Sequence, residues 1–205
     1  MPNNKNKVVL TGFGPFKDHP VNASWVAAST LATIGFPSRD DIDLVTCEIP
    51  VEYTTVKETV PTLWNEHKPD LMVHVGVSGI ANAITLEQQA HNDNYCKKDF
   101  IGQCPADYKC VSTVPTDCLM SGIDMDLVCI EINNDTNTPV NAVTSLDPGR
   151  YLCDFIYFTS LNIDRSRTAF IHVPPLNDPY SAHELALGLQ KAILAMLSQL
   201  RDNDH

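Results

Sequence analysis

Cys153 and His172 are the two residues whose chemistry and neighbours first suggest a reactive site. His172 lies within residues 168–173 (TAFIHV), an apolar run typical of a buried strand, and a buried imidazole needs hydrogen-bond partners. Cys153 follows Asp147 and Pro148, which we interpret as the cap and the first residue of a helix. A helix N-terminus and a nearby imidazolium both favour the thiolate, the nucleophilic form of cysteine. The two side chains could therefore act as nucleophile and base if the fold brings them together.

Each of these residues also has a plain structural interpretation, which the residue pattern leaves open. A buried cysteine is most often a small hydrophobic side chain, and Cys47 and Cys129 are comparable cases. A lone histidine in a buried strand is more often structural than catalytic. His74, in residues 71–77 (LMVHVGV), raises the same question, and the pattern does not rank it against His172.

A third feature is the loop of residues 12–16 (GFGPF), which follows the first expected strand. Its glycines let the backbone approach a ligand closely, and Phe13 and Phe16 could wall a small apolar pocket. The alternative is a turn whose aromatic rings join the core. The glycine spacing fits neither a dinucleotide-binding fingerprint nor a phosphate-binding P-loop, so we expect no nucleotide cofactor. Asn22, just beyond, can cap a helix that runs to Gly35.

The elements that must position these residues alternate between strand-like and helix-like segments, which predicts an α/β fold with a largely parallel sheet. In such sheets ligands bind beyond the carboxyl ends of the strands. The expected strands cover residues 8–13, 43–51, 71–77, 84–86, 140–144 and 168–173. The expected helices cover residues 22–35, the region of 56–64, 124–132, a segment from 147 through 158, and a final helix that a capping box at 181–184 opens. Residues 92–122 hold four of the seven cysteines and predict a long loop.

Composition and charge narrow the class of protein. The 205 residues fit a single domain spanning 1–205, with flexible ends at 1–7 and 202–205. A net charge of −11 disfavours nucleic-acid partners, and no apolar run is long enough for a membrane span. Seven cysteines cannot all pair within one chain, and the polar N-terminus does not read as a signal peptide. We therefore expect free thiols and a cytoplasmic protein.

Several blocks of the sequence occur together in the order and at the spacing of one known family. They are residues 12–16 (GFGPF), 21–25 (VNASW), 86–87 (LE) with 91–92 (HN), 149–153 (GRYLC) and 170–174 (FIHVP). On these blocks the chain, from about residue 8 to 200, resembles the pyroglutamyl peptidase I (pyrrolidone-carboxylate peptidase) family and is most similar to its animal members. Pro148 departs from the Ala that the family resemblance leads us to expect before the glycine.

The resemblance implies an open α/β/α sandwich and a cofactor-free cysteine peptidase. Such an enzyme removes an N-terminal pyroglutamyl (5-oxoprolyl) residue from peptides through a thioester acyl-enzyme. The matching positions imply a triad in which Cys153 is the nucleophile, His172 its base and Glu87 the group that orients the base. They also place Phe13 and Phe16 around the pyroglutamyl ring. Asn22 matches an asparagine near that pocket, and it suits a helix cap equally well.

Two other functions stay open as alternatives. One is a catalytically silent domain of the same fold that binds a small ligand. The other is an esterase or deacylase of another α/β type, against which the absence of a Gly-x-Ser-x-Gly motif counts. The cysteines of 92–122 are spaced too widely for a Cys-x-x-Cys zinc site, so we predict no metal. The expected partners are pyroglutamyl peptides, and the sequence leaves the oligomeric state open.

Overall fold

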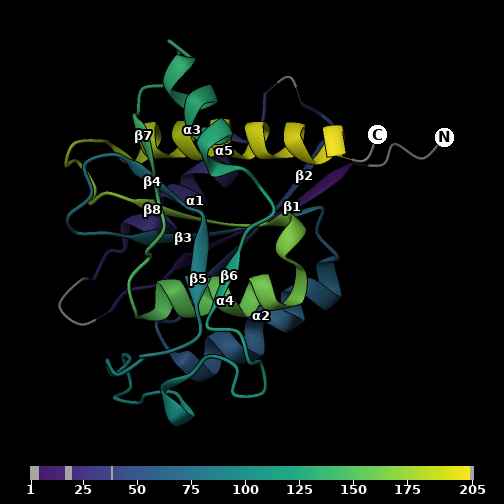
Figure 1. Cartoon of the computed structure of the whole chain (residues 1–205). Helices are drawn as coiled ribbons and strands as arrows, with labels where there is room; N and C mark the ends of the chain where they lie inside the picture. Colours follow the sequence, from purple (N-terminus) through teal and green to yellow (C-terminus); the bar gives the residue numbers. More distant parts are fainter. Residues whose placement is uncertain (1–4, 17–19, 38, 204–205) are drawn as a thin grey trace.

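The expected strands assemble into one six-stranded sheet in the order β2-β1-β3-β8-β4-β7 (Figure 1). In this computed structural model, the structure describes residues 5–16, 20–37 and 39–203. The central strands are the buried apolar runs β3 (Leu71–Val77) and β8 (Thr168–Val173). Around them lie β1 (Asn6–Phe13), β2 (Ile42–Ile49), β4 (Ile84–Glu87) and β7 (Ala142–Ser145).

The direction of the strands confirms the prediction of an α/β fold with a largely parallel sheet. β2, β1, β3 and β8 run parallel, whereas β4 runs antiparallel to β8 and parallel to β7. This reversal follows from a short connection. Parallel strands need a crossover of about a dozen residues or more, but only residues 78–83 separate β3 from β4. β8 comes later in the chain and inserts between them.

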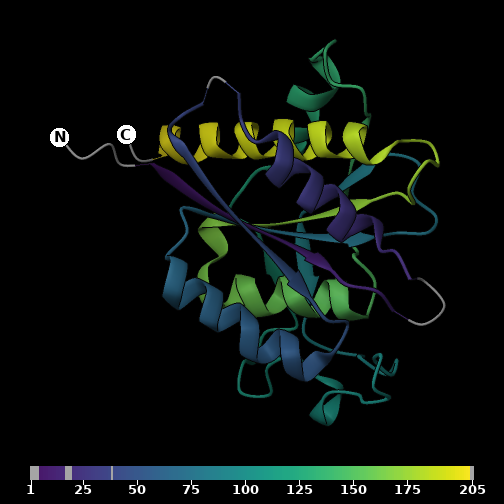
Figure 2. The same ribbon diagram turned by 180° about the vertical axis from the view of Figure 1, so that it is seen from behind.

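Helices cover both faces of the sheet, so the elements form three layers (Figures 1 and 2). One face carries α1 (Ala23–Ile34), α3 (Met125–Asn134) and α5 (Ala182–Asn203), and the other carries α2 (Tyr53–His67) and α4 (Leu152–Asp164). Successive strand side chains alternate between the two cores. Val73 and Ile171 pack with α1 and α5, whereas Met72 and Phe170 pack with α2 and α4.

The helix ends that the sequence predicted are formed largely as expected. The Asn22 side chain accepts a hydrogen bond from the Ser24 N–H at 3.1 Å, and α1 ends at Gly35 with φ of 62°. The capping box of α5 is also present. Ser181 N–H donates to Glu184 Oε2 at 2.8 Å, and Glu184 N–H donates to Ser181 Oγ at 3.2 Å.

The long loop at 92–122 is only partly irregular. Its end forms β6 (Cys118–Met120), which pairs antiparallel with β5 (Gln89–His91), and a short 3₁₀ helix spans Ala106–Tyr108. Buried Asn92 ties the loop together, because its side chain both donates to and accepts from the backbone of Val111, at 3.0 and 2.8 Å. β6 is too short to show periodicity in the sequence.

The predicted flexible ends are partly structured. β1 already begins at Asn6 and includes Lys7, and α5 continues through Asn203. Of the predicted ends, residues 1–4 and 204–205 lie outside the described residues.

The start of α4 differs from the prediction. The helix begins at Leu152, and the Asp147 carboxylate accepts a hydrogen bond from the Gly149 N–H at 3.1 Å instead of capping a helix. Gly149 has φ of 83°, a left-handed conformation that glycine adopts readily. An Asp-Pro-Gly sequence is a turn signal, and here the turn prevails over the helix start. Cys153 is therefore the second residue of α4, inside its first turn.

Candidate active site

The thiol, imidazole and carboxylate singled out in the sequence come from three elements that meet on one face of the sheet. His172 lies on β8, and Glu87 is the last residue of β4. Because β4 runs antiparallel to β8, Glu87 pairs with Phe170 and lies diagonally from His172. His172 Nδ1 lies 2.8 Å from Glu87 Oε1, and both side chains are buried.

Cys153 reaches the same place from the first turn of α4. Its sulfur lies over Gly76 on β3, which pairs with His172. A Cβ atom at Gly76 would lie 2.6 Å from Cys153 Sγ and 3.3 Å from His172 Cδ2. The missing side chain thus leaves room for the thiol and the imidazole to lie side by side.

The electrostatics of this group favour the imidazolium form of His172. Burial lowers the pKa of His172, but the negative charges and hydrogen bonds of Cys153 and Glu87 outweigh it and raise that pKa to about 10. Glu87 Oε2 is buried and makes no hydrogen bond within the described residues. Since Nδ1 is committed to Glu87, Nε2 is the ring nitrogen that remains for the thiol.

The backbone around Cys153 can stabilise negative charge. The first N–H groups of an α-helix have no hydrogen-bond partner within the helix. In α4 the first i to i−4 hydrogen bond runs from the Phe155 N–H to the Tyr151 carbonyl. The N–H groups of residues 152–154 precede that bond. The partial positive charge at a helix N-terminus acts within its first turn, where Cys153 lies.

A small apolar cavity opens beside the Cys153 side chain. It has a volume of about 60 Å³ and is lined by Phe13, Phe16, Asn22, Val51, Val77, Tyr151, Leu152 and Cys153. Phe13 and Phe16 both line it, and Phe13 is also buried in the core, so the residue combines the two interpretations that the sequence left open. A second, larger apolar cavity of about 340 Å³ continues past Phe16 and Val77 to Pro175 and Leu176.

Asn22 has its polar atoms committed to the protein itself. Its Oδ1 accepts from the N–H and hydroxyl of Ser24, and its Nδ2 donates to the Gly14 carbonyl at 3.0 Å. Asn22 therefore both caps α1 and fixes the Phe13–Phe16 loop beside the cavity. The helix-cap interpretation is confirmed.

Sequence reasoning missed several residues of the site. Val51 and Val77 carry no motif. Tyr151 and Leu152 lie in the block of residues 149–153, but no role was assigned to them, and only the fold shows that all four line the cavity. Gly76 did leave a signal, because a glycine inside a strand otherwise rich in β-branched residues often marks a close approach by another group.

His74 is separate from this group. It pairs with Phe170 in the sheet, and its Nδ1 lies 2.7 Å from Thr11 Oγ1. Complete burial lowers the pKa of His74 to about 3, so the ring is neutral near pH 7. Its environment is that of a core histidine, which is the structural alternative raised by the sequence.

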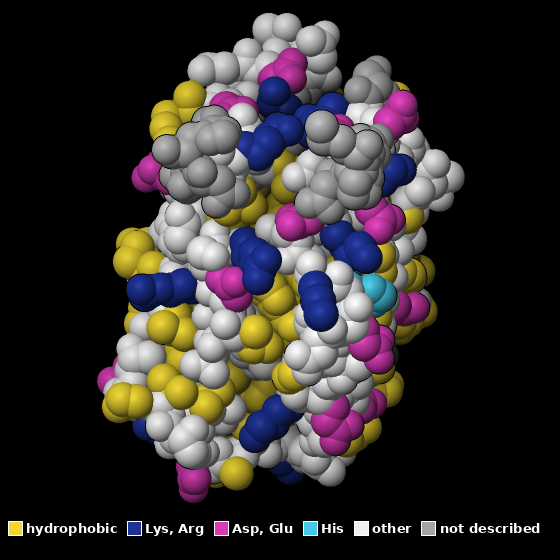
Figure 3. All heavy atoms as spheres, turned by 90° about the vertical axis from the view of Figure 1, so that its right-hand side faces the viewer, with side chains coloured by type: hydrophobic (Ala, Val, Ile, Leu, Met, Phe, Trp, Pro, Cys, Tyr) yellow, Lys and Arg dark blue, Asp and Glu magenta, His cyan; other side chains and the backbone are white. Residues whose placement is uncertain are grey.

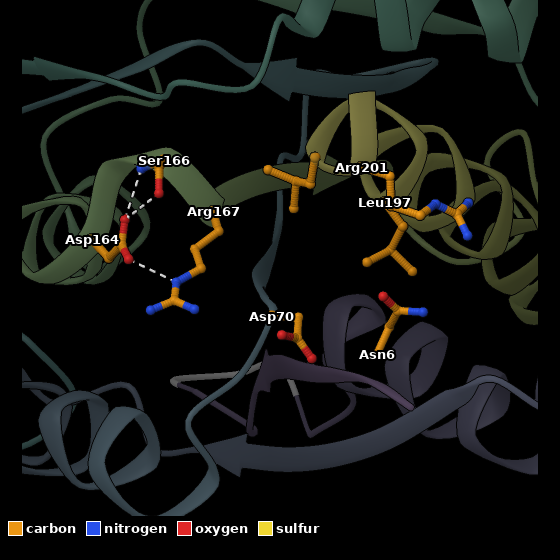
Figure 4. A pocket seen from close by; sticks show the side chains of 8 residues that line it. Asn6, Asp70, Asp164, Ser166, Arg167, Leu197 and Arg201 are labelled. Carbon is orange, nitrogen blue, oxygen red and sulfur yellow. Dashed lines mark hydrogen bonds and ion pairs between the residues drawn. The ribbon is translucent and has the colours of Figure 1, made fainter. Parts of the chain in front are cut away.

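A polar cavity at the opposite end of the sheet lacks a nucleophile. It has a volume of about 240 Å³ and is lined by Asn6, Asp70, Asp164, Ser166, Arg167, Leu197, Leu200 and Arg201 (Figure 4). Arg167 Nε donates to Asp164 at 2.7 Å, and its guanidinium lies over the Trp64 ring. Acidic and basic side chains are interspersed over this end of the molecule (Figure 3). Arg201 lies 3.8 Å from Asp41, and Asp70 accepts a hydrogen bond from the Lys7 N–H. The described residues that line the cavity include no thiol–imidazole pair, so it offers no comparable chemistry.

Neither a metal-binding cluster nor a membrane-spanning helix is present among the described residues. No cluster of three or more His, Cys, Asp or Glu side chains is arranged to hold a metal ion within that part of the chain. None of the helices in it is both long enough and apolar enough to cross a membrane.

A thiol at a helix N-terminus, paired with an imidazole that a carboxylate holds, is the arrangement found in cysteine peptidases. The model of the pyroglutamyl peptidase family matches residues 6–196. Pyroglutamyl-peptidase 1 of Rattus norvegicus is 47% identical over 96% of this chain and 92% of its own. The Homo sapiens protein of that name is 46% identical over 98% of this chain and 94% of its own. This chain belongs to the pyroglutamyl peptidase family.

Solved structures confirm the fold. The pyroglutamyl peptidase I of Bacillus amyloliquefaciens superposes with a TM-score of 0.82 at 22% identity, over 96% of this chain and 98% of the other. A mutant pyrrolidone carboxyl peptidase of Pyrococcus furiosus gives a TM-score of 0.83 at 24% identity, over 95% and 99%.

Proposed function

We propose that this chain is a cysteine exopeptidase that removes an N-terminal pyroglutamyl residue from peptides. The observation that carries the proposal is the apolar cavity of Phe13 and Phe16, which opens on the thiol of Cys153 beside the His172 imidazole. Membership of the pyroglutamyl peptidase family, at 47% identity to the rat enzyme, supports the same activity. The peptidase unit is the whole domain, residues 1–205.

Cys153, His172 and Glu87 carry out acyl transfer in two steps. The Cys153 thiolate attacks the carbonyl carbon of the pyroglutamyl residue, and the imidazolium of His172 gives its Nε2 proton to the leaving amine. The C–N bond breaks and a thioester remains. Water then attacks the thioester carbonyl while His172 takes a proton from the water. The C–S bond breaks, pyroglutamate leaves, and the Cys153 thiolate and His172 imidazolium are restored. Glu87 holds Nδ1–H throughout, which fixes the ring orientation.

The backbone at the start of α4 stabilises the oxyanion of both tetrahedral intermediates. Donors fixed in advance, in a site shielded from water, act most strongly on charge that develops during the reaction. The N–H groups of residues 152–154 are such donors, because they precede the first intrahelical hydrogen bond.

The cavity suits a neutral lactam ring. A pyroglutamyl group has no ammonium, and none of the described residues that line the cavity is acidic. Aromatic and aliphatic walls bind its ring, and nearby backbone groups supply the few polar contacts that such sites use. A free N-terminal ammonium would enter without a counter-charge, which is costly.

The proposed location is the cytoplasm. All seven cysteines are free thiols, and a thiolate nucleophile keeps its activity in a reducing compartment.

Turnover of matched amides tests this function. We expect the purified protein to cleave a fluorogenic pyroglutamyl amide and to leave the prolyl amide intact, because proline lacks the lactam carbonyl and carries a charged ring nitrogen. Sites built to bond a substrate group reject analogues that lack it by roughly 10⁴ to 10⁵ in kcat/KM. Similar kcat/KM values for the two amides would contradict the pocket assignment. Binding of the pyroglutamyl compound without turnover would instead support the silent ligand-binding domain.

A further inference from the structure

Asp154, the residue after the proposed nucleophile, is a fully buried carboxyl group that the mechanism above does not use. Burying a carboxylate is costly unless it is paired and hydrogen-bonded. An apolar side chain of similar size would occupy this buried position on α4 at a lower desolvation cost. The partners of Asp154 therefore indicate what this position does.

Its partners join α4 to the segment that follows Glu87. Asp154 Oδ1 accepts a hydrogen bond from the His91 N–H on β5 at 2.9 Å, and His91 Nδ1 lies 3.4 Å from the same oxygen. Oδ2 lies 3.2 Å from the Tyr95 hydroxyl, which also bonds the His91 carbonyl. Arg150, in the turn before α4, places Nη1 3.7 Å from Oδ2.

Tyr157 makes a second connection from the same helix face. Residues three apart on a helix are neighbours, so Asp154 and Tyr157 both face the β4–β5 segment. The Tyr157 hydroxyl donates to the Glu87 carbonyl at 2.8 Å. α4 thus contacts this segment at Glu87 and again at His91. Glu87 is the residue that holds His172, and Cys153 directly precedes Asp154.

We propose that Asp154 is a positioning residue, which fixes the first turn of α4 on the β4–β5 segment and so sets the distance from Cys153 to the His172–Glu87 pair. This inference rests on the proposed function. Its physical basis is that the Cys153 thiol is on α4 whereas the Glu87 carboxylate is on β4. The contacts of Asp154 with His91 and Tyr95 fix the position of α4 relative to the segment that follows Glu87. Misplacing reacting groups by about 1 Å can cost about 10²-fold in rate.

The test compares three variants by kcat, KM and unfolding midpoint on the pyroglutamyl amide. Asp154→Ala removes both oxygens, and we expect kcat to fall about 10²-fold with KM nearly unchanged. Asp154→Asn keeps an oxygen that accepts the His91 N–H, so it should restore most of kcat. Ser160→Ala is the matched control, because Ser160 is buried in the same helix and accepts the Trp64 Nε1–H at 2.8 Å. It should lose stability and keep kcat.

Alkylation of Cys153 by iodoacetamide, followed against pH, gives a readout that does not depend on peptidase activity. Loosening the thiol from His172 should move the onset of rapid alkylation in Asp154→Ala to higher pH and leave it unchanged in Ser160→Ala. Wild-type kcat and an unchanged alkylation profile in a folded Asp154→Ala protein would overturn the proposal. An inactive wild-type protein would overturn the proposed function instead, and the alkylation profile would still decide the role of Asp154.

Discussion

Among single residues, Gly76 is important because it has no side chain. It lies one residue before the end of β3, where it pairs with His172 of β8. The space that a side chain would take at this position is occupied by Cys153 Sγ and by the ring edges of Phe170 and His172. The distance between thiol and imidazole is therefore set partly by a position that has no functional group.

We predict that Gly76→Ala lowers kcat about 10²-fold, because its methyl group would lie 2.6 Å from Cys153 Sγ and must displace it. Gly79→Ala is the matched control, since a Cβ there meets nothing within 4 Å. Steady-state kinetics on the pyroglutamyl amide, with circular dichroism to confirm folding, would measure both. Full activity in Gly76→Ala would show that the sulfur lies elsewhere during catalysis.

Residue types and local pattern singled out Cys153 and His172 as candidates, but they left the structural interpretation of each open and did not rank His172 above His74. They did not predict Glu87 without the family resemblance. Glu87 reaches His172 only because β4 runs antiparallel to β8, which puts Glu87 opposite Phe170. Register between strands that are far apart in the sequence leaves no periodic signal in either one.

At the scale of elements, the sequence predicted the strands well and the start of α4 poorly. β3 and β8 have the predicted bounds because both are uninterrupted apolar runs. At α4, residues 147–149 form a turn, and the helix begins only at Leu152. This later start matters for the chemistry. Because the helix begins at Leu152, Cys153 lies in its first turn, where the helix amides and the helix dipole act on it.

The α4–β5 contact predicts a pH effect on stability. Burial raises the pKa of Asp154 from 3.8 to about 7, against the lowering effects of the His91 N–H, Arg150 and Tyr95, with Asp147 raising it slightly. The folded state then binds a proton that the unfolded state has released, so stability falls as pH rises through this window. Asparagine does not titrate. Asp154→Asn should therefore gain stability relative to wild type as pH rises from about 4 to 7.

Urea unfolding of both proteins across that range measures the effect. His91 Nδ1 lies 3.4 Å from Asp154 Oδ1, so the difference between the proteins reports the titration of this pair of groups. A constant difference in unfolding free energy at every pH would mean that the pKa of Asp154 is the same in the folded and unfolded states.

At the scale of the whole molecule, the thiols differ widely in environment. Burial raises the pKa of Cys110 to about 12, and it also raises the pKa of Cys47, Cys118 and Cys129. Cys153 instead lies beside the imidazole of His172, whose pKa is raised. The same residue type therefore spans the range from core side chain to proposed nucleophile, and only the fold separates the cases.

We predict that iodoacetamide labels Cys153 first and Cys110 last among the seven cysteines. An ordinary thiol is only a few per cent thiolate near pH 7, so an ion-paired thiol should react roughly tenfold faster or more. Peptide mapping by mass spectrometry after short exposures gives the order, and repeating it near pH 6 should widen the lead. Labelling of exposed Cys96 ahead of Cys153 would count against the ion pair.

The place of β8 in the sheet has a consequence for how the protein is made. β8 is the last strand to leave the ribosome, yet it lies between β3 and β4 in the finished sheet. Until it emerges, β1 to β3 and the β4–β7 pair have no strand to join them, and two strand edges that will become central stay open to other chains. Cys153 is synthesised before His172 and has no imidazole partner in that interval. The nascent chain therefore carries an inactive thiol, and the enzyme becomes reactive in the same event that closes its sheet.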